Sequence, residues 1–382
     1  MRPQFEVNIY EIGNNGGYTK LNINMRADIN TLDNEITKQS NMLRTERLDV
    51  SFGEILNMYE HGEIVIDPVF QRLFRWDDEQ KTRFIESLLL GIPIPPIFVA
   101  ANNEGIWELV DGLQRISTFL SFIGVLKLNK QSDKKNKWKL LSGTRVGSLE
   151  GYTYETLPQK YRLSLKRAVC RVEILKWDSN YDMRYELFNR LNTGGTPLTQ
   201  QEIRNCIFRD ISSKFNDFLH ELAGNKDFKQ TVMLSHEQNE CLFNEELVLR
   251  FFVLFDGGAS MSIHSGLAQY MTDYMKSALQ NESYDYVGHK NLFIRVFKVL
   301  VKLGYEIFRQ PNGMFATALY DVITYGIAVN IDKYEIEDPK EIMKVIKEKV
   351  RKNETFLKVS RRGGNNQKER IVNRIRVAKE VF

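Results

Sequence analysis

The sequence IWELVDGLQRISTFLSFIG, residues Ile106–Gly124, combines the signals of a strand, a tight turn and a helix. Ile106–Val110 is a short apolar run typical of a buried strand, and the pair Asp111–Gly112 is typical of a turn. Apolar side chains then recur at the spacing of one helical face, at Ile116, Phe119, Leu120 and Ile123. We therefore predict a strand–turn–helix unit here.

The start of this predicted helix has the properties of an anion-binding corner. The first N–H groups of a helix have no partners within the helix and carry a partial positive charge, which suits phosphate. Gly112 would let the backbone approach a ligand closely, and Arg115 adds a forked cation that fits phosphate oxygens. The alternative is that Asp111 only caps the helix and that Arg115 is solvated. The local pattern leaves both interpretations open.

The residues around this unit predict the rest of an α+β domain. In chain order, the expected elements are a helix from Ser51 to Gly62 with a capping box to Glu54, a strand over Glu63–Ile66, a helix from Asp77 to Gly91, a strand over Ile97–Ala100 and a last strand over Ala168–Lys176. Pro93, Pro95 and Pro96 make a stiff turn before Ile97–Ala100. We expect that strand to pair with Ile106–Val110.

The first 47 residues predict an arm. Apolar and polar residues alternate on both sides of Asn14–Gly17, which indicates a β-hairpin, and a linker or a polar helix follows. A lone hairpin is only marginally stable in water. We therefore expect the arm to lie on the main body or on a partner.

From Tyr181 onward the pattern is helical. Tyr181–Leu191 predicts one helix, Asn192–Gly195 a turn, and Thr199 with Glu202 the capping box of the next helix. Further helical segments are expected at 211–223, 245–255, 263–279, 292–308, 314–328, 339–356 and 367–381, each with an amphipathic pattern. We divide the chain into an arm and linker (1–47), an α+β domain (48–180) and an all-helical domain with a basic tail (181–382).

The composition is that of a soluble globular protein. The 382 residues are 42% hydrophobic and 27% charged, and a chain of this length can bury the cores of two domains. No apolar run approaches the roughly 18 residues of a membrane span, and the first residues lack the apolar core of a signal peptide. The three cysteines lie far apart and the five histidines are scattered, which excludes a disulfide framework and a zinc motif. We expect a cytoplasmic protein that does not bind membranes.

Positive charge is concentrated at the end of the sequence. Residues 339–382 contain fourteen Lys or Arg and five Asp or Glu, a net charge of +9, so the rest of the chain carries −5. The candidate DNA-binding residues are Arg361, Arg362, Lys368, Arg370, Arg374 and Arg376. They would contact phosphates and add affinity without reading sequence. The alternative is a solvated amphipathic helix with Ile371, Ile375 and Ala378 on its buried side.

The corner sequence DGLQR, residues 111–115, resembles the DGQQR box of the N-terminal domain of the GmrSD-type restriction family, a ParB/sulfiredoxin-like domain. Three other stretches resemble boxes of that family in the expected order: FQRLFRW (70–76), IESLLLGIPIPPIFV (85–99) and FNRLNTGGTPLTQQEIRN (188–205). Together the four stretches place the resemblance over roughly residues 50–210. Leu113 departs from the pattern, because the family most often has Gln there.

The resemblance implies a nucleoside triphosphate and Mg²⁺ at the corner. The implied nucleotide-binding residues are Gln71, Arg72, Gly112, Leu113 and Arg115, and the implied catalytic residues are Asp111, Gln114 and Arg115. Asp111 would hold Mg²⁺ or orient a water, and Gln114 would position the attacking water. Gln71 and Arg72 would complete the pocket from the opposite wall; the alternative is a turn pair with a surface arginine.

The resemblance also implies a role in a bacterial anti-phage, modification-dependent restriction system. The protein would bind and slowly hydrolyse a nucleotide, and would couple the nucleotide state to DNA, with modified phage DNA as the candidate, or to a nuclease partner of the HNH or another type. The sequence itself shows no nuclease motif, and a homo-oligomer is left open. One alternative is a ParB-like, nucleotide-gated DNA-binding module with little or no turnover, which Leu113 favours. Another is an antitoxin-like or scaffolding partner with an inactive pocket.

Overall fold

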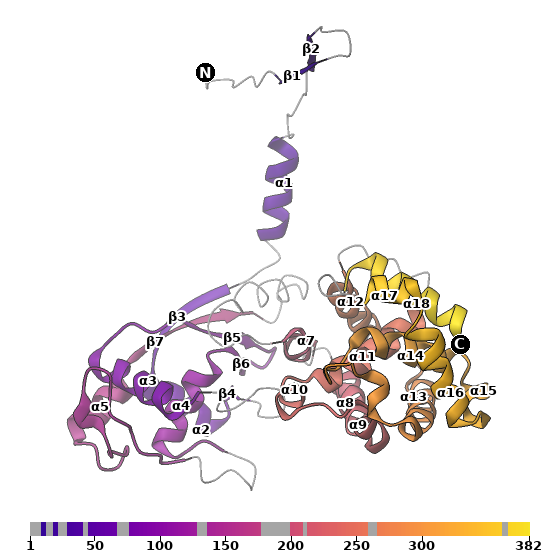
Figure 1. Ribbon diagram of the computed structural model, residues 1–382. Coiled ribbons are helices and arrows are strands. Elements are labelled where there is room, and N and C mark those ends of the chain that lie inside the picture. The colour runs from indigo at the N-terminus through magenta and orange to yellow at the C-terminus, as the bar shows by residue number, and fades with distance from the viewer. Residues whose placement is uncertain are drawn as a thin grey trace.

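The computed structural model contains a mixed β-sheet unit followed by a bundle of helices (Figure 1). It describes residues 9–12, 18–21, 29–40, 45–66, 76–127, 136–176, 199–208, 212–258, 266–360 and 366–382. The predicted α+β class and the helical C-terminal region are confirmed. Among the residues so described, no helix has the length and apolar character that crossing a bilayer requires.

The sheet has five strands and contains both parallel and antiparallel pairs. The strands are β3 (Thr45–Ser51), β4 (Ile64–Val65), β5 (Ile97–Ala101), β6 (Trp107–Asp111) and β7 (Val169–Leu175), in the order β3-β7-β5-β6-β4. β5 pairs antiparallel with β6 and parallel with β7. The four predicted strands are confirmed. β3 was expected to be partly linker, yet all seven of its residues pair with β7.

Four helices belong to this sheet unit, and local capping defines where two of them begin. The helices are α2 (Phe52–His61), α3 (Asp78–Leu90), α4 (Leu113–Ile123) and α5 (Gln159–Arg167). The Ser51 hydroxyl accepts a hydrogen bond from the Glu54 N–H, and Asp77 and Gln80 form a complete capping box. These side chains satisfy N–H groups that have no partner within the helix. Both predicted helix starts are confirmed.

The two faces of the sheet contribute to different cores. Val99, Leu109 and Ile174 belong to the core that contains the side chains of α2–α4, whereas their neighbours in sequence Ala100, Val110 and Leu175 pack with the helical bundle. Adjacent residues of a strand point to opposite faces, which explains this division. One sheet therefore contacts both parts of the protein.

Twelve α-helices form the described part of the C-terminal region. They are α7 (Gln200–Phe208), α8 (Ser213–Ala223), α9 (Lys226–Val232), α10 (His236–Glu240), α11 (Phe243–Gly257), α12 (Leu267–Gln280), α13 (Tyr286–Leu300), α14 (Thr317–Val329), α15 (Ile331–Ile336), α16 (Pro339–Lys344), α17 (Glu354–Val359) and α18 (Lys368–Val381). The predicted capping box of Thr199 and Glu202 is confirmed in both directions. The predicted helix Tyr181–Leu191 and the turn Asn192–Gly195 lie outside the described residues.

Three helical predictions need correction. The segment 314–328 is not amphipathic, because every residue of α14 from Ala318 to Ala328 is buried. Within the segment 292–308, the α-helix ends at Leu300, and two short 3₁₀ helices follow it. The segment 339–356 is interrupted, because α16 runs into a π-helical stretch, Val345–Val350, before α17 begins.

A buried charge cluster joins three helices of the bundle. The Asp321 carboxylate of α14 accepts hydrogen bonds from Arg250 Nε and Nη2 of α11, at 2.5 and 2.7 Å, and from Arg374 Nη1 of α18, at 2.9 Å. All three side chains are at most 2% exposed. One carboxylate thus holds two guanidinium groups away from solvent.

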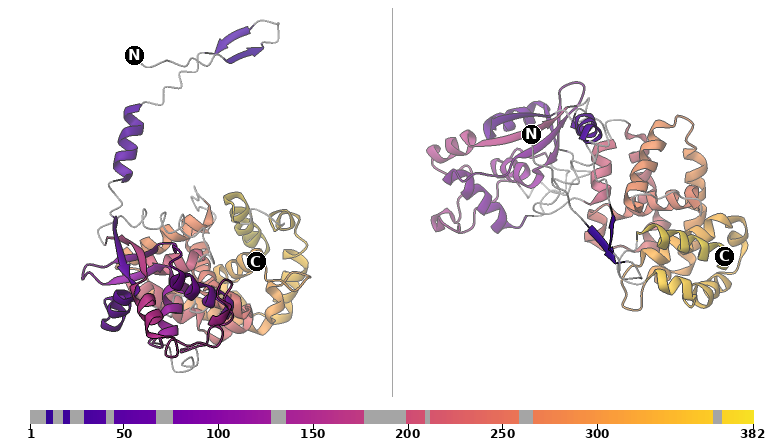
Figure 2. Two further views of the ribbon diagram at one scale, coloured as in Figure 1. Left: turned by 90° about the vertical axis from the view of Figure 1, so that its left-hand side faces the viewer. Right: turned by 90° about the horizontal axis from the view of Figure 1, so that it is seen from above.

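The N-terminal arm stands away from the rest of the protein (Figures 1 and 2). The hairpin β1 (Ile9–Ile12) and β2 (Tyr18–Leu21) pairs antiparallel as predicted, and the polar segment forms helix α1 (Ile29–Ser40). The side chains of residues 32–38 are all exposed. Of our two expectations for the hairpin, contact with the main body is wrong, because β1 and β2 lie away from it in Figures 1 and 2.

A histidine–glutamate pair makes the stability of the bundle depend on pH. His220 Nδ1 lies 2.8 Å from the buried Glu245 Oε1. This hydrogen bond raises the pKa of His220 above its ordinary value; partial burial opposes the rise, and the Glu245 charge adds to it. The stabilisation is therefore fully present below the ordinary histidine pKa, about 6.5, and is lost as the pH rises through the folded-state pKa.

We expect His220→Gln to destabilise the protein more at about pH 6 than at about pH 9, because only the protonated imidazole gains from the Glu245 carboxylate. Urea unfolding at both pH values measures this difference. His236→Gln is the matched control, since the His236 side chain is 87% exposed. Equal destabilisation by His220→Gln at the two pH values would contradict the prediction.

Candidate anion-binding corner

Arg115 is held at the start of α4 by three oxygen atoms from two parts of the chain. Its Nη1 donates to the carbonyl oxygens of Pro95 and Pro96, at 2.6 and 3.2 Å, and its Nη2 donates to Asp111 Oδ2 at 2.7 Å. The Arg115 side chain is 11% exposed, so the interpretation that it is simply solvated is wrong. The guanidinium is fixed in position beside the helix N-terminus.

Asp111 combines the ion pair with access to solvent. It is the last residue of β6 and lies opposite Phe98 of β5, where the register shifts between Phe98 and Val99. Such an irregularity bends a strand and redirects a side chain. The Asp111 side chain remains 48% exposed although it pairs with Arg115. Its carboxylate can therefore meet a ligand from solvent.

Gly112 is required by the backbone and by a neighbouring strand. Its φ of +100° lies in the left-handed region, and a Cβ built there would come within 2.5 Å of Ile97 Cγ2. Only glycine avoids both the strain and this overlap. Gly112 therefore allows β5 to pack tightly against the turn, a role that our sequence interpretation, close approach of a ligand, did not include.

Leu113 and Gln114 both face the protein rather than an open cavity. Leu113 is 8% exposed and belongs to the core of the sheet unit, so its side chain offers no polar group to a ligand. Gln114 Oε1 accepts a hydrogen bond from the Trp76 N–H at 3.2 Å. The Trp76 ring lies 5.5 Å from that of Phe84 on α3. Gln114 therefore connects Trp76, which precedes the N-cap of α3, to the first turn of α4.

The two remaining predicted pocket residues, Gln71 and Arg72, lie outside the described residues. Gln114 contacts Trp76, which is the first described residue after the segment 67–75 that contains both of them.

The corner fits a cation that is held mainly by its ligand. Within the described ranges, no group of three or more His, Cys, Asp or Glu side chains could hold a metal ion. Asp111 is instead a single, half-exposed carboxylate. Mg²⁺ commonly binds one or two carboxylates and completes its coordination with water and phosphate oxygens. Asp111 is compatible with that mode of binding.

The basic tail divides into exposed and buried residues. Lys368 and Arg376 on α18 are exposed and Arg370 is partly buried, whereas Arg361 and Arg362 lie outside the described residues. For Arg374, our prediction of DNA binding is wrong. It is completely buried, and it donates to Asp321 and to the Val359 carbonyl at 3.0 Å. Ile371, Ile375 and Ala378 are buried on the same helix, as predicted.

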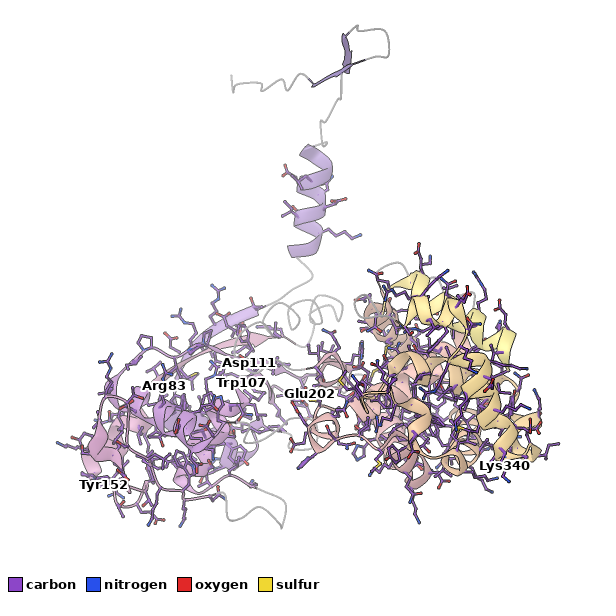
Figure 3. The ribbon with its side chains drawn as sticks, viewed as in Figure 1. Arg83, Trp107, Asp111, Tyr152, Glu202 and Lys340 are labelled. Carbon is purple, nitrogen blue, oxygen red and sulfur yellow. The ribbon has the colours of Figure 1, made fainter. Side chains whose placement is uncertain are left out.

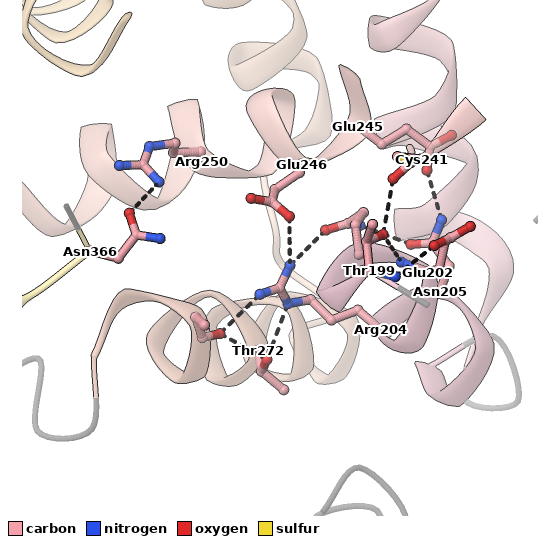
Figure 4. A network of polar contacts seen from close by, with 12 residues as sticks. Thr199, Glu202, Arg204, Asn205, Cys241, Glu245, Glu246, Arg250, Thr272 and Asn366 are labelled. Carbon is pink, nitrogen blue, oxygen red and sulfur yellow. Dashed lines mark hydrogen bonds and ion pairs between the residues drawn. The ribbon is translucent and has the colours of Figure 1, made fainter. Parts of the chain in front are cut away.

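Helix α7 carries a buried polar network that our sequence analysis did not identify (Figure 4). Arg204 donates to Gln201 Oε1 at 2.9 Å within α7, and to Thr272 Oγ1 and the Ala268 carbonyl of α12, both at 3.1 Å. Asn205 donates to Glu245 Oε2 of α11 at 2.7 Å. The only signal in the sequence is the polar run Thr199–Asn205, which reads equally well as the exposed first turn of a helix.

The apolar side of α7 shares a hydrophobic core with one face of the sheet. Ile203 and Ile207 belong to the same core as Ala100 and Val110, and Val110 precedes Asp111. α7 lies between the sheet and the other helices in Figure 1, and Figure 3 labels Asp111 in the sheet and Glu202 on α7. The corner and the bundle are thus joined through one buried helix.

Comparison with known proteins identifies one family. Residues 52–209 match the family described as GmrSD restriction endonuclease, N-terminal domain. The match covers about two fifths of the chain and includes the corner, the Pro95–Pro96 turn and α7. The comparisons with curated proteins and with solved structures found no significant match.

Proposed function

We propose, from the match of residues 52–209 to the GmrSD-type N-terminal domain, that the protein is a nucleoside triphosphate-dependent subunit of a bacterial restriction system. It binds the triphosphate with Mg²⁺ at the α4 corner, hydrolyses it slowly, and couples the nucleotide state to DNA or to a nuclease partner. The observation that carries this proposal is Arg115, which is largely buried and fixed beside the N-terminus of α4 with the half-exposed Asp111 next to it.

The residues of the corner divide the proposed work. A helix N-terminus and a fixed guanidinium together suit the charge of a phosphate chain. Asp111 would hold the Mg²⁺ that accompanies the phosphates, and the bound metal would supply a further positive charge beside them. Gln114 accepts a hydrogen bond from the Trp76 N–H through its amide oxygen, which holds Trp76 close to α4. Gly112 and Leu113 contribute backbone groups at the turn.

The direct test measures wild-type protein with ATP, GTP, CTP and UTP in the presence of Mg²⁺. Calorimetry reports binding and a phosphate-release assay reports turnover. We expect binding and slow release with at least one of the four nucleotides. Absence of both with all four would overturn the proposed function.

A second candidate function is a ParB-like, nucleotide-gated DNA-binding module with little or no turnover. The observation that favours it is the buried Leu113, because a core leucine cannot orient water or contact phosphate through its side chain. Nucleotide binding without phosphate release in the same assay would select this function over the first.

α7 gives the proposed coupling a physical route. Its apolar side packs on the sheet next to the corner, and its polar side is hydrogen-bonded to α11 and α12. Buried polar groups keep their partners, because an unpaired one costs about 1–3 kcal/mol. A movement of the β6 end would therefore be transmitted to the bundle rather than absorbed at α7.

We further propose that the exposed basic residues of α18 contact DNA phosphates. Replacing Lys368, Arg376 and Lys379 together by alanine is expected to weaken binding to duplex DNA. It should also lower the slope of log affinity against log salt by about one for each phosphate that the variant no longer neutralises. A fluorescence anisotropy titration at several salt concentrations measures both quantities.

The matched control removes the same charge from the other end of the protein. Lys160, Lys166 and Arg167 are exposed on α5 of the sheet unit, and their alanine variant should keep the wild-type slope. Arg374 is left unchanged, since it is a core residue. An unchanged slope in the α18 variant would reject this surface.

A further inference from the structure

Both terminal nitrogens of Arg115 already have partners, so a phosphate that binds Nη2 must either share this nitrogen with the Asp111 carboxylate or replace it. Two of the three acceptors are backbone carbonyl oxygens of Pro95 and Pro96, where the proline rings restrict the turn. The third acceptor is the side chain of Asp111, which is half exposed. The side-chain contact is the one that can open without moving the backbone.

Asp111 also opposes an incoming phosphate through its charge. Its carboxylate contacts the Arg115 group that would attract the phosphate, at 2.7 Å. A phosphate oxygen that approached Nη2 would meet a negative charge at contact distance, and like charges so placed repel each other. A carboxylate of the protein itself thus contacts the nitrogen of Arg115 to which a phosphate would bind.

We propose that Asp111 gates this site, so that it admits a triphosphate only together with a divalent cation. Asp111 would then hold the cation through its carboxylate, and Nη2 of Arg115 would be free to donate to a phosphate oxygen in place of that carboxylate. Pro95 and Pro96 hold Nη1 throughout, so that the arginine stays in place while its partner changes. This inference rests on the proposed function, and it adds a binding order that the family resemblance does not supply.

The gate makes a prediction opposite in sign to that for a simple metal ligand. Asp111→Asn keeps the shape of the side chain but removes the charge. A residue that only holds the metal would, when replaced, leave metal-free binding unchanged. Replacing a residue that gates the site would instead strengthen metal-free binding. We expect Asp111→Asn to bind inorganic triphosphate without metal about three- to tenfold more tightly than wild type, the range for an ion pair that is partly screened by solvent.

The experiment is a calorimetric titration of inorganic triphosphate into the full chain, in EDTA and in Mg²⁺. Inorganic triphosphate is the part that all four nucleotides share. Wild type is expected to bind much more tightly with Mg²⁺ than without, and Asp111→Asn to lose most of that difference. Asp49→Asn is the matched control, because Asp49 pairs with Arg171 on the same sheet and both side chains are more than half exposed.

The possible results separate the gate from the proposed function. If wild type binds with Mg²⁺ and Asp111→Asn gains nothing in EDTA, the gate is wrong and the nucleotide site stands. If Asp49→Asn increases the affinity in EDTA as much as Asp111→Asn does, the increase comes from the lower net negative charge of the protein, and the gate is wrong. If wild type binds neither inorganic triphosphate nor any nucleotide under either condition, the proposed function fails and the gate fails with it.

Discussion

Asp321→Ala is expected to destabilise the protein by about 3–5 kcal/mol, the cost of breaking a buried ion pair from one side. Asp321 is completely buried and is the shared partner of Arg250 and Arg374. Without it, two guanidinium groups would remain in a site from which solvent is excluded, and they would repel each other. The ties between α11, α14 and α18 would be lost together.

Urea unfolding followed by circular dichroism measures this loss. The matched control is Asp332→Ala, which removes a carboxylate that also pairs with an arginine, Arg295, but on the surface, where the Asp332 side chain is 90% exposed. An exposed pair of this kind typically contributes up to about 1 kcal/mol. A loss from Asp321→Ala no larger than that from Asp332→Ala would show that the cluster does not hold the bundle together.

A second experiment separates charge from packing at the same site. The combined variant Arg250→Met, Asp321→Leu and Arg374→Met removes all three charged groups and keeps comparable volume. Well-packed apolar residues in place of a buried ionic cluster are often neutral or stabilising. We expect the combined variant to be more stable than Asp321→Ala alone.

Arg115→Ala is expected to weaken binding of a triphosphate with Mg²⁺ by about 100-fold, the usual scale for losing a buried, hydrogen-bonded charge partner. The loss has two physical parts. The fixed positive charge at the start of α4 disappears, and the Pro95 and Pro96 carbonyls lose the donor that holds their turn against α4. Calorimetric titration of the nucleotide that wild type prefers measures the effect.

Arg115→Lys distinguishes these two parts. A lysine keeps the charge but cannot reproduce the fork that contacts Asp111 and the proline carbonyls together. We expect it to recover part of the affinity. Arg171→Ala is the control, because Arg171 pairs with Asp49 on the same sheet and its side chain is 59% exposed. If Arg115→Ala bound the nucleotide as tightly as wild type, the α4 corner would be rejected as the nucleotide site.

Local features of the fold could be predicted from the sequence because they depend on residues close in the chain. The caps at Ser51, Asp77 and Thr199 each join a side chain to a group three residues away. The strand–turn–helix unit around Gly112 depends on an apolar run and one glycine in the same way. Spacing alone indicates such contacts, since the chain brings the two groups together without help from the rest of the fold.

The chemical roles of several residues depended on partners that are distant in sequence. Arg374 reads as one of many basic tail residues, and only Asp321, 53 residues earlier, makes it a core residue. From the sequence alone, Arg115 could be either solvated or ligand-binding. Its hydrogen bond to the Pro95 carbonyl, 20 residues away, shows that it is held by the protein. The polar residues of α7 become a network only when α11 and α12 pack against them.

The sequence by itself thus determined the class of the fold, four of the five strands of the sheet and the position of the α4 corner. The tertiary structure alone decided which charges are buried, which carbonyl oxygens hold Arg115, and that one face of the sheet packs on the helical bundle. The physical reason is that a charged side chain becomes a core group, an ion-pair partner or a surface group according to what surrounds it. Those surroundings are assembled from segments that no local pattern connects.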